Sequence, residues 1–81
     1  MVQENLHKFQ ATVAAVLGLS PAQVIDPLNS QTVDTWDSLN HINLISALEQ
    51  EFGVVLPAET MTTTQSVAVL KELLKQHGVE L

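Results

Sequence analysis

The chain has no cysteine and no arginine, and it has no long run of apolar residues. Without cysteine there can be no disulfide, no thiolate metal site and no thiol nucleophile from the protein itself. The longest uninterrupted apolar run, Val13 to Leu17, is far too short to cross a membrane. The first residues lack the basic and apolar regions of a secretory signal. We therefore expect one small cytoplasmic domain over residues 1–81.

Positive charge is also scarce. Three lysines stand against nine acidic residues, which gives a net charge of −6. The lysines lie near the two ends, so the excess of acids falls between Phe9 and Leu70. This charge would repel nucleic acid and anionic membranes, and it would attract proteins with basic patches. We expect protein partners and neither nucleic acid nor membrane, with acidity for solubility alone as the simpler explanation.

Helical periodicity predicts an all-α fold, a small bundle of three main helices plus one short helix. The first helix should end at Gly18, where glycine can close a helix. The second should run from about Ser38 to Phe52 and stop at the next glycine. The last should start after Thr62–Thr64, one of which should cap it, and should end at Gly78.

The connecting segments are predicted from their turn-forming residues. Ser20–Gln23 has a capping hydroxyl, a proline and a glutamine at the spacing of one capped turn. Residues 26–37 keep no apolar period and should form a long loop. Pro57–Met61 should form the short helix or one irregular turn.

A serine and an exposed leucine stand at the expected start of the second helix. On a helical wheel, Leu39 lies away from the apolar side of this helix. That apolar side is formed by Ile42, Ile45, Leu48 and Phe52, with Leu44 at its margin. Asp37 or Ser38 can simply cap the helix. The Ser38 hydroxyl would also be accessible at the positive end of the helix dipole, where an attached phosphodiester is stabilised. The residues alone leave both interpretations open.

Asp37-Ser38-Leu39, with a helix that ends in Ala47-Leu48-Glu49-Gln50-Glu51-Phe52-Gly53-Val54, closely resembles the acyl carrier protein family. The resemblance covers almost the whole chain. It implies that Ser38 carries 4′-phosphopantetheine, transferred from coenzyme A by a Mg²⁺-dependent phosphopantetheinyl transferase, with Asp37 and Leu39 as adjacent recognition residues. The terminal thiol would hold an acyl thioester, which fits a chain without cysteine. We therefore expect a carrier and not an enzyme, a monomer that visits acyl-loading and acyl-processing enzymes with basic docking patches.

The resemblance also implies two groups of binding residues. An acyl pocket between the helices would be lined by His41, Ile42, Ile45, Leu48 and Phe52. A partner-facing surface would be formed by Trp36, Asn43, Ser46, Glu49 and Gln50.

Several positions depart from the pattern of the family. Thr35 stands where glycine is common, and Asn40 and Asn43 stand where acids are common. Fewer charges on this helix should weaken steering to the usual enzymes of fatty acid synthesis, which favours a specialised carrier. His41 is either a buried neutral histidine bonded to a backbone carbonyl, or a polar residue at the pocket mouth that favours short or polar cargo.

Other functions have less support in the sequence. A hydrolytic triad of Ser38, His41 and an aspartate would lack the Gly-x-Ser-x-Gly elbow and an oxyanion hole. The three histidines are widely separated along the chain, which disfavours a metal site. A stand-alone aminoacyl or peptidyl carrier stays open. So does an unmodified helical interaction module with Leu39 as its docking residue, and modification of Ser38 distinguishes it from a carrier.

Overall fold

The structure is a computed structural model that describes residues 2–60 and 65–81. Its helices are α1 (Val2–Leu17), the single-turn helix η1 (Pro21–Gln23), α2 (Ser38–Phe52) and α4 (Val67–Gln76). Outside these helices, the described residues form one isolated β-bridge and no strand. The all-α fold predicted from periodicity is confirmed. None of the described helices is long and apolar enough to cross a membrane.

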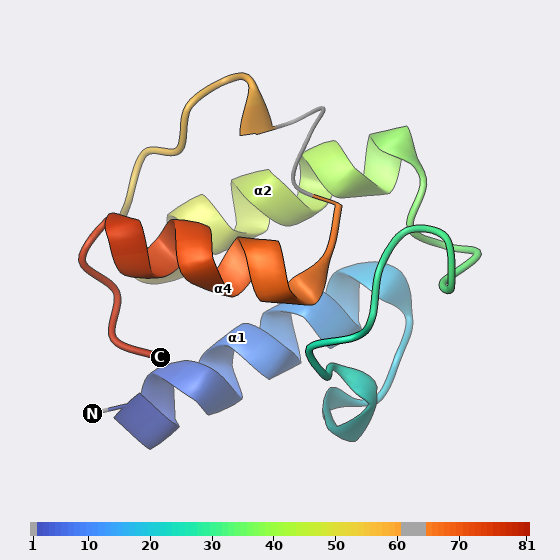
Figure 1. The fold of residues 1–81 in the computed structure, drawn as a ribbon, viewed down its shortest axis with the longest axis horizontal. Helices are drawn as coiled ribbons and strands as arrows, with labels where there is room; N and C mark the ends of the chain where they lie inside the picture. Colours follow the sequence, from blue (N-terminus) through green and yellow to red (C-terminus); the bar gives the residue numbers. More distant parts are fainter. Residues whose placement is uncertain (1, 61–64) are drawn as a thin grey trace.

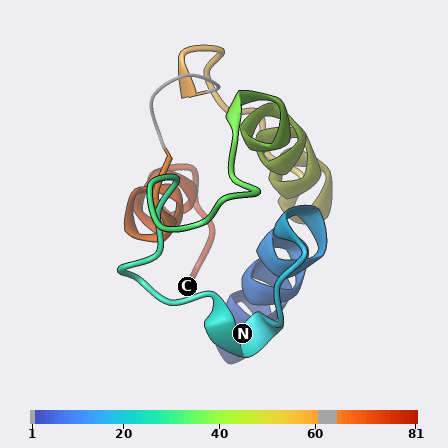
Figure 2. The ribbon, with the colours of Figure 1, turned by 90° about the vertical axis from the view of Figure 1, so that its right-hand side faces the viewer.

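The three α-helices of the described residues enclose one core. Figure 2 shows α1 and α2 on one side of the molecule and α4 on the other. In Figures 1 and 2 the C-terminus lies near the start of α1. At that end, the Asn5 side chain donates a hydrogen bond to the backbone oxygen of Glu80 at 2.9 Å. The buried side chains from the helices form a single cluster that includes Phe9, Val13, Leu17, Leu44, Ile45, Leu48, Val67, Leu70 and Leu74.

The boundaries of α2 follow from its capping residues and agree with the prediction. Asp37 is the N-cap, and its Oδ1 accepts a hydrogen bond from the backbone N–H of Asn40 at 2.8 Å. Gly53 ends the helix in the left-handed conformation with φ +64°, which a residue with a side chain adopts only with strain. The single turn expected at Ser20–Gln23 is confirmed as η1, and its capping box is formed.

The start of α4 differs from the prediction. Ser66 caps this helix by accepting a hydrogen bond from Val69 N–H at 3.2 Å, so the expected threonine cap is wrong. Ser66 is fixed for this role because it pairs with Asn29 in the β-bridge. Thr62–Thr64 lie outside the described residues. The helix ends at Gln76, just before Gly78, whose φ of +89° turns the chain.

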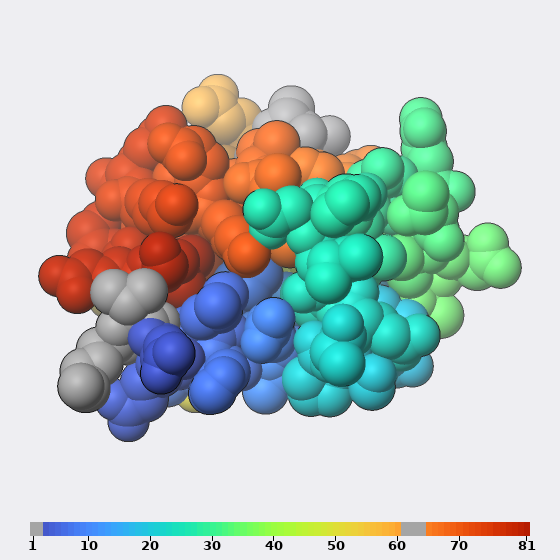
Figure 3. Space-filling view, turned by 60° about the horizontal axis from the view of Figure 1, so that its bottom comes forward, coloured from blue at the N-terminus to red at the C-terminus, as the bar shows by residue number. Residues whose placement is uncertain are grey.

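The expected long loop is tied to all three helices. Val67 N–H donates to Leu28 O at 2.9 Å, which joins the loop to α4. The Thr35 hydroxyl donates to Leu17 O at 2.6 Å, at the end of α1. Trp36 is buried in the core beside α2. In Figure 3 this loop, turquoise to green, covers one end of the molecule, and its last residues project there with the start of α2.

The segment after α2 is described only in part. Thr60 N–H donates to Pro57 O at 3.0 Å, so Pro57–Thr60 forms a turn. The expected short helix over Pro57–Met61 therefore begins with a turn, and its continuation lies outside the described residues.

Candidate functional site

Ser38 is an exposed residue at the first position of α2. The capping role that the sequence left open between Asp37 and Ser38 belongs to Asp37. No hydrogen bond joins the Ser38 hydroxyl to the part of the chain that the structure describes. This hydroxyl is therefore exposed to solvent at the positive end of a 15-residue helix. The helix does not need it as a cap, because Asp37 has that role.

The loop that leads to Ser38 is held by two residues that depart from the family pattern. The Thr35 hydroxyl bonds to the end of α1, and the Asn40 side-chain amide donates to Thr35 O at 2.7 Å. Thr35 is thus attached to α1 on one side and to the first turn of α2 on the other. The sequence did not reveal this pairing, because nothing in a loop without period shows which side chains will meet.

Trp36, His41 and Thr60 form a buried chain of hydrogen bonds. The indole Nε1–H of Trp36 lies 3.0 Å from Nδ1 of His41, and Nε2 of His41 lies 2.8 Å from Thr60 O. The relative exposures are 2% for Trp36, 0% for His41 and 4% for Thr60. An indole nitrogen only donates, so Nδ1 must accept and the ring proton must lie on Nε2. His41 is therefore a neutral imidazole that uses both ring nitrogens.

Two predictions about these residues are wrong. Trp36 was expected on the partner-facing surface, but it is buried because its indole N–H finds its acceptor inside, on His41. His41 was a candidate for the mouth of an acyl pocket, but it is fully buried between the indole and a backbone carbonyl. The simpler interpretation of His41, a buried neutral ring bonded to a carbonyl, is the correct one.

The outward face of α2 carries two exposed apolar side chains. Leu39 is 68% exposed, as the wheel predicted. Ile42 is 41% exposed, so its assignment to the inner side is wrong. The buried positions of α2 are His41, Leu44, Ile45 and Leu48, a stripe that leaves Ile42 at its outer edge. Asn43 and Gln50 are exposed as expected and Ser46 is half-buried. From Ser38 to Leu48 the helix has no Asp, Glu, Lys or Arg.

The two acids of α2 lie at its far end and are engaged within the chain. Glu49 is half-buried, and its Oε2 accepts a hydrogen bond from Leu56 N–H at 2.8 Å. Its carboxylate therefore serves the fold, contrary to its expected place on the partner-facing surface. Glu51 lies 4.0 Å from the Lys8 ammonium, between half-exposed side chains.

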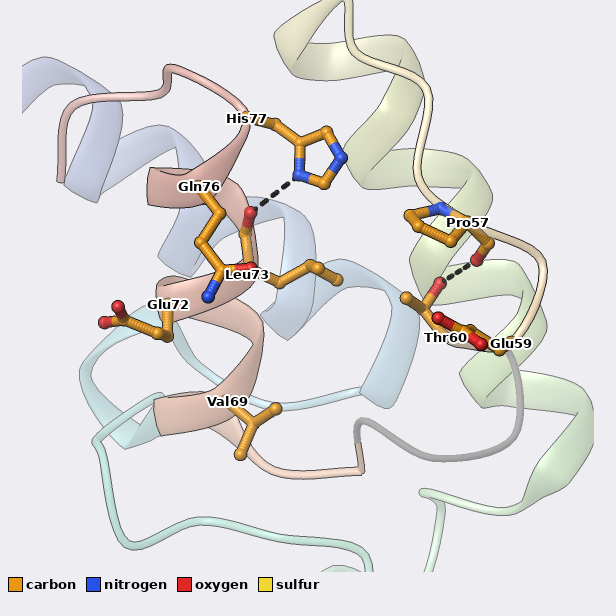
Figure 4. Close-up of a pocket in the computed structure, with 8 residues that line it drawn as sticks. All are labelled: Pro57, Glu59, Thr60, Val69, Glu72, Leu73, Gln76 and His77. Carbon is orange, nitrogen blue, oxygen red and sulfur yellow. Dashed lines mark hydrogen bonds between the residues drawn. The ribbon is translucent and has the colours of Figure 1, made fainter.

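The other expected lining residues of an acyl pocket are in or against the core. Ile45 and Leu48 are fully buried, and Phe52 is half-buried against them. A cavity of about 370 Å³ opens elsewhere, between α4 and Pro57–Thr60. Figure 4 shows Leu73 on α4 and His77, which directly follows this helix, extending towards that segment. None of the residues predicted to line a pocket contributes to this cavity, which is lined by Pro57, Glu59, Thr60, Val69, Glu72, Leu73, Gln76 and His77.

The structure thus presents a small helical bundle with an exposed serine hydroxyl at the start of a helix that another residue caps. Residues 7–74 match the family described as "Phosphopantetheine attachment site". The chain is 40% identical over 67 residues to an acyl carrier protein of Thermosynechococcus vestitus, covering 79% of this chain and 83% of the relative. It is 40% identical over 83 aligned residues to an acyl carrier protein of Cyanidioschyzon merolae, covering 98% and 87%.

The chain belongs to the phosphopantetheine-binding acyl carrier protein family. It is therefore a carrier and not a catalyst, and its cofactor is 4′-phosphopantetheine. The environment of Ser38 fits that group, because the hydroxyl is exposed and Asp37 already caps the helix. Its partners include enzymes that process acyl groups.

Proposed function

We propose that Ser38 is the attachment site, and that the chain presents an acyl thioester to enzymes of fatty acid, polyketide or another specialised acyl-transfer pathway. The observation that carries this proposal is that Asp37, and not Ser38, caps α2. Asp37 caps α2, so the Ser38 oxygen can form an ester without loss of a hydrogen bond that stabilises the helix. The bound group would supply the thiol that a chain without cysteine lacks.

The residues around Ser38 would orient the attached phosphodiester. The first turn of α2 has backbone N–H groups without intrahelical partners, and these favour an anion beside them. The bonds of Thr35 to α1 and of Asn40 to Thr35 hold the approach to Ser38 in one geometry. Ordering this loop in advance reduces the entropy that a partner enzyme must overcome when it binds.

The partner-facing surface in this proposal consists of Leu39, Ile42, Asn43, Ser46 and Gln50 on α2. A phosphopantetheinyl transferase, or an enzyme that acts on the acyl group, must approach Ser38 and would contact this surface first. Exposed Asp34 and Asp37 in the loop give the same region its negative charge, which suits a partner with a basic docking patch. We also propose that the protein acts as a monomer in the cytoplasm, since its net charge opposes self-association.

Intact-protein mass spectrometry tests the attachment. The unmodified chain is incubated with coenzyme A, Mg²⁺ and a broad-specificity phosphopantetheinyl transferase. The wild type should gain one phosphopantetheine and Ser38→Ala none. Ser46→Ala is the matched control, because Ser46 is the other serine of α2 and should leave the gain intact.

The protein isolated from its own cells provides the second half of the test. A bare Ser38 both there and after incubation with the transferase would contradict attachment, and would favour an unmodified interaction module. The mass of any group found on the native thiol would separate an acyl carrier from a stand-alone aminoacyl or peptidyl carrier.

A further inference from the structure

The loop that leads to Ser38 is joined to the first turn of α2 through one residue, Asn40. The side-chain amide of Asn40 donates a hydrogen bond to Thr35 O at 2.7 Å, and its backbone N–H donates to Asp37 Oδ1 at 2.8 Å. Thr35 and Asp37 precede Ser38 in the chain, and Asn40 follows it. The two bonds therefore close a short segment of chain around the serine.

Thr35 continues this connection to α1. Its hydroxyl donates to Leu17 O at 2.6 Å, and Leu17 is the last residue of that helix. The last carbonyls of a helix have no partner within the helix, so a side-chain donor at this place satisfies one of them. Because Thr35 donates through its side chain and accepts through its backbone, its bonds to Leu17 and Asn40 act in series between α1 and α2. These two bonds are called the Thr35–Asn40 link below.

The chemistry of both side chains suits the link. A carboxamide has the N–H donor that the Thr35 carbonyl needs, whereas an ionised carboxylate of the same shape only accepts. A hydroxyl likewise donates to the Leu17 carbonyl, and a valine of the same shape has no donor. Each bond can therefore be removed at almost constant side-chain volume, while Thr35→Ser keeps the hydroxyl.

We infer that Thr35 and Asn40 are positioning residues for the transfer of phosphopantetheine to Ser38, because the link fixes the loop that presents the serine relative to α1 and α2. The inference rests on the proposed attachment at Ser38. In that reaction the Ser38 oxygen forms a bond to the phosphorus that bears the pantetheine group, and the pyrophosphate bond of coenzyme A breaks. Adenosine bisphosphate leaves, and the hydroxyl proton passes to solvent or to a base of the transferase. Thr35 and Asn40 take no part in these bond changes and act through the placement of the serine.

The link should affect kcat and leave KM nearly unchanged. A transferase that contacts Leu39 and Ile42, the exposed apolar side chains of α2, can bind the chain whether or not the loop is in place. A loose loop then adds complexes in which the serine is misaligned with the phosphorus, and such complexes lower kcat. Loss of an apolar docking side chain has the opposite signature, a higher KM. The two kinetic constants therefore distinguish positioning from docking.

The test measures kcat and KM for transfer from coenzyme A to the full chain, with Asn40→Asp, Asn40→Ala and Thr35→Val beside the wild type. Each variant should lower kcat by about 3- to 10-fold, the factor that corresponds to one lost hydrogen bond, with KM changed by less than about 2-fold. Equal losses in Asn40→Asp and Asn40→Ala identify the missing donor as the cause, since only one of them adds a charge. The double variant Thr35→Val/Asn40→Asp should fall no more than about 2-fold below the slower single variant, because the loss of either bond interrupts a series.

Two substitutions serve as controls. Thr35→Ser keeps the hydroxyl and should restore kcat to within about 2-fold of the wild type. Thr12→Val makes the same change as Thr35→Val within α1, where the Thr12 hydroxyl donates to Lys8 O at 2.8 Å, and it should transfer as the wild type does. Thermal unfolding shows whether each variant is folded at the assay temperature. If Thr35→Val does not fold, the two Asn40 variants provide the test.

Wild-type kcat in both folded Asn40 variants would overturn the inference, and so would a loss in Asn40→Asp alone, which would trace the effect to charge. A rise in KM with kcat unchanged would assign these residues to docking and would overturn it too. Thr35→Ser as slow as Thr35→Val would remove Thr35 from the positioning role. A wild type that gains no phosphopantetheine would instead contradict attachment at Ser38, and the intact mass shows this before any rate is measured.

Discussion

Nε1–H of Trp36 donates a hydrogen bond to Nδ1 of His41 at 3.0 Å, with both side chains buried and their ring centroids 6.2 Å apart. Trp36 precedes Ser38 in the loop, and His41 follows it on α2. The bond therefore joins the chain on the two sides of the proposed attachment site. Because α2 begins between these residues, the position of Ser38 depends on a contact that is itself hidden from solvent.

The first prediction concerns the tautomer of His41. Since the indole can only donate, Nδ1 of His41 should be unprotonated and Nε2 should carry the hydrogen that bonds Thr60 O. Long-range ¹H–¹⁵N correlation spectra at neutral pH report the two ring nitrogens separately. A ring protonated on Nδ1 would contradict the hydrogen bond from Trp36 to His41, and exposed His7 provides a reference signal in the same spectrum.

The second prediction is the cost of removing the indole N–H. Trp36→Phe removes the indole N–H that donates to the buried Nδ1 of His41, which should lower the free energy of unfolding by about 1–3 kcal/mol before any loss of packing. For a domain of this size each kcal/mol corresponds to a Tm decrease of roughly 4–8 °C. Thermal unfolding of wild type and variant measures this directly.

The matched control for Trp36→Phe is Val55→Ala, at a side chain that is 84% exposed. It should change the free energy of unfolding by less than about 0.5 kcal/mol. Equal stability of Trp36→Phe and wild type would show that the indole hydrogen bond contributes nothing. A double-mutant cycle with His41→Leu then isolates the interaction between the two rings.

The boundaries of α2 could be predicted from sequence because they depend on local signals. An aspartate before an apolar period caps the helix, and a glycine after it accepts positive φ. Ser38 and Leu39 were found for the same reason, since a helical wheel needs only neighbouring residues. The cap of α4 was missed because Ser66 is fixed by a contact with Asn29, which lies far away in the sequence.

The bonding partners of the polar side chains could not be predicted, because they lie in other segments. His41 faces inward since Trp36 and Thr60 satisfy both of its nitrogens. Ile42 faces outward because the buried stripe of α2 passes through His41 and Leu44 and leaves it at the edge. A wheel weighted by hydrophobicity assigns isoleucine to the core, and it therefore misplaces Ile42.

The third prediction separates the two acids of α2. Glu49→Ala removes the acceptor of the Leu56 N–H and leaves a partly buried donor unpaired, so it should destabilise the protein by about 1–3 kcal/mol. Glu51→Ala removes only a half-exposed contact of 4.0 Å with Lys8, which should cost no more than about 1 kcal/mol. Chemical denaturation of both variants compares them under the same conditions.

Glu49→Gln refines this comparison, because glutamine keeps an acceptor oxygen and loses the charge. It should recover part of the stability that Glu49→Ala loses. If Glu49→Ala and Glu51→Ala are equally stable, the carboxylate of Glu49 is not needed by the fold and is free to act on the surface after all.

The fourth prediction concerns the exposed apolar side chains of α2. Leu39→Ala and Ile42→Ala should each lower kcat/KM for phosphopantetheine transfer by about 5- to 30-fold, through a higher KM, since apolar contacts at the centre of an interface are worth roughly 1–2 kcal/mol. Their Tm values should match the wild type, because Leu39 is 68% and Ile42 41% exposed. Val55→Ala, exposed beyond the other end of α2, should transfer as fast as the wild type.

Salt gives this prediction a second test. From Ser38 to Leu48 the helix carries no Asp, Glu, Lys or Arg, so the part of the binding energy lost in Leu39→Ala and Ile42→Ala should not depend on ionic strength. The acids of the loop contribute the salt-dependent part. Asp34→Asn should therefore reduce transfer mainly at low salt, where exposed charges are least screened. Equal losses for Asp34→Asn at low and high salt, or salt-dependent losses for the two apolar variants, would contradict this division of the docking surface into an apolar helix and an acidic loop.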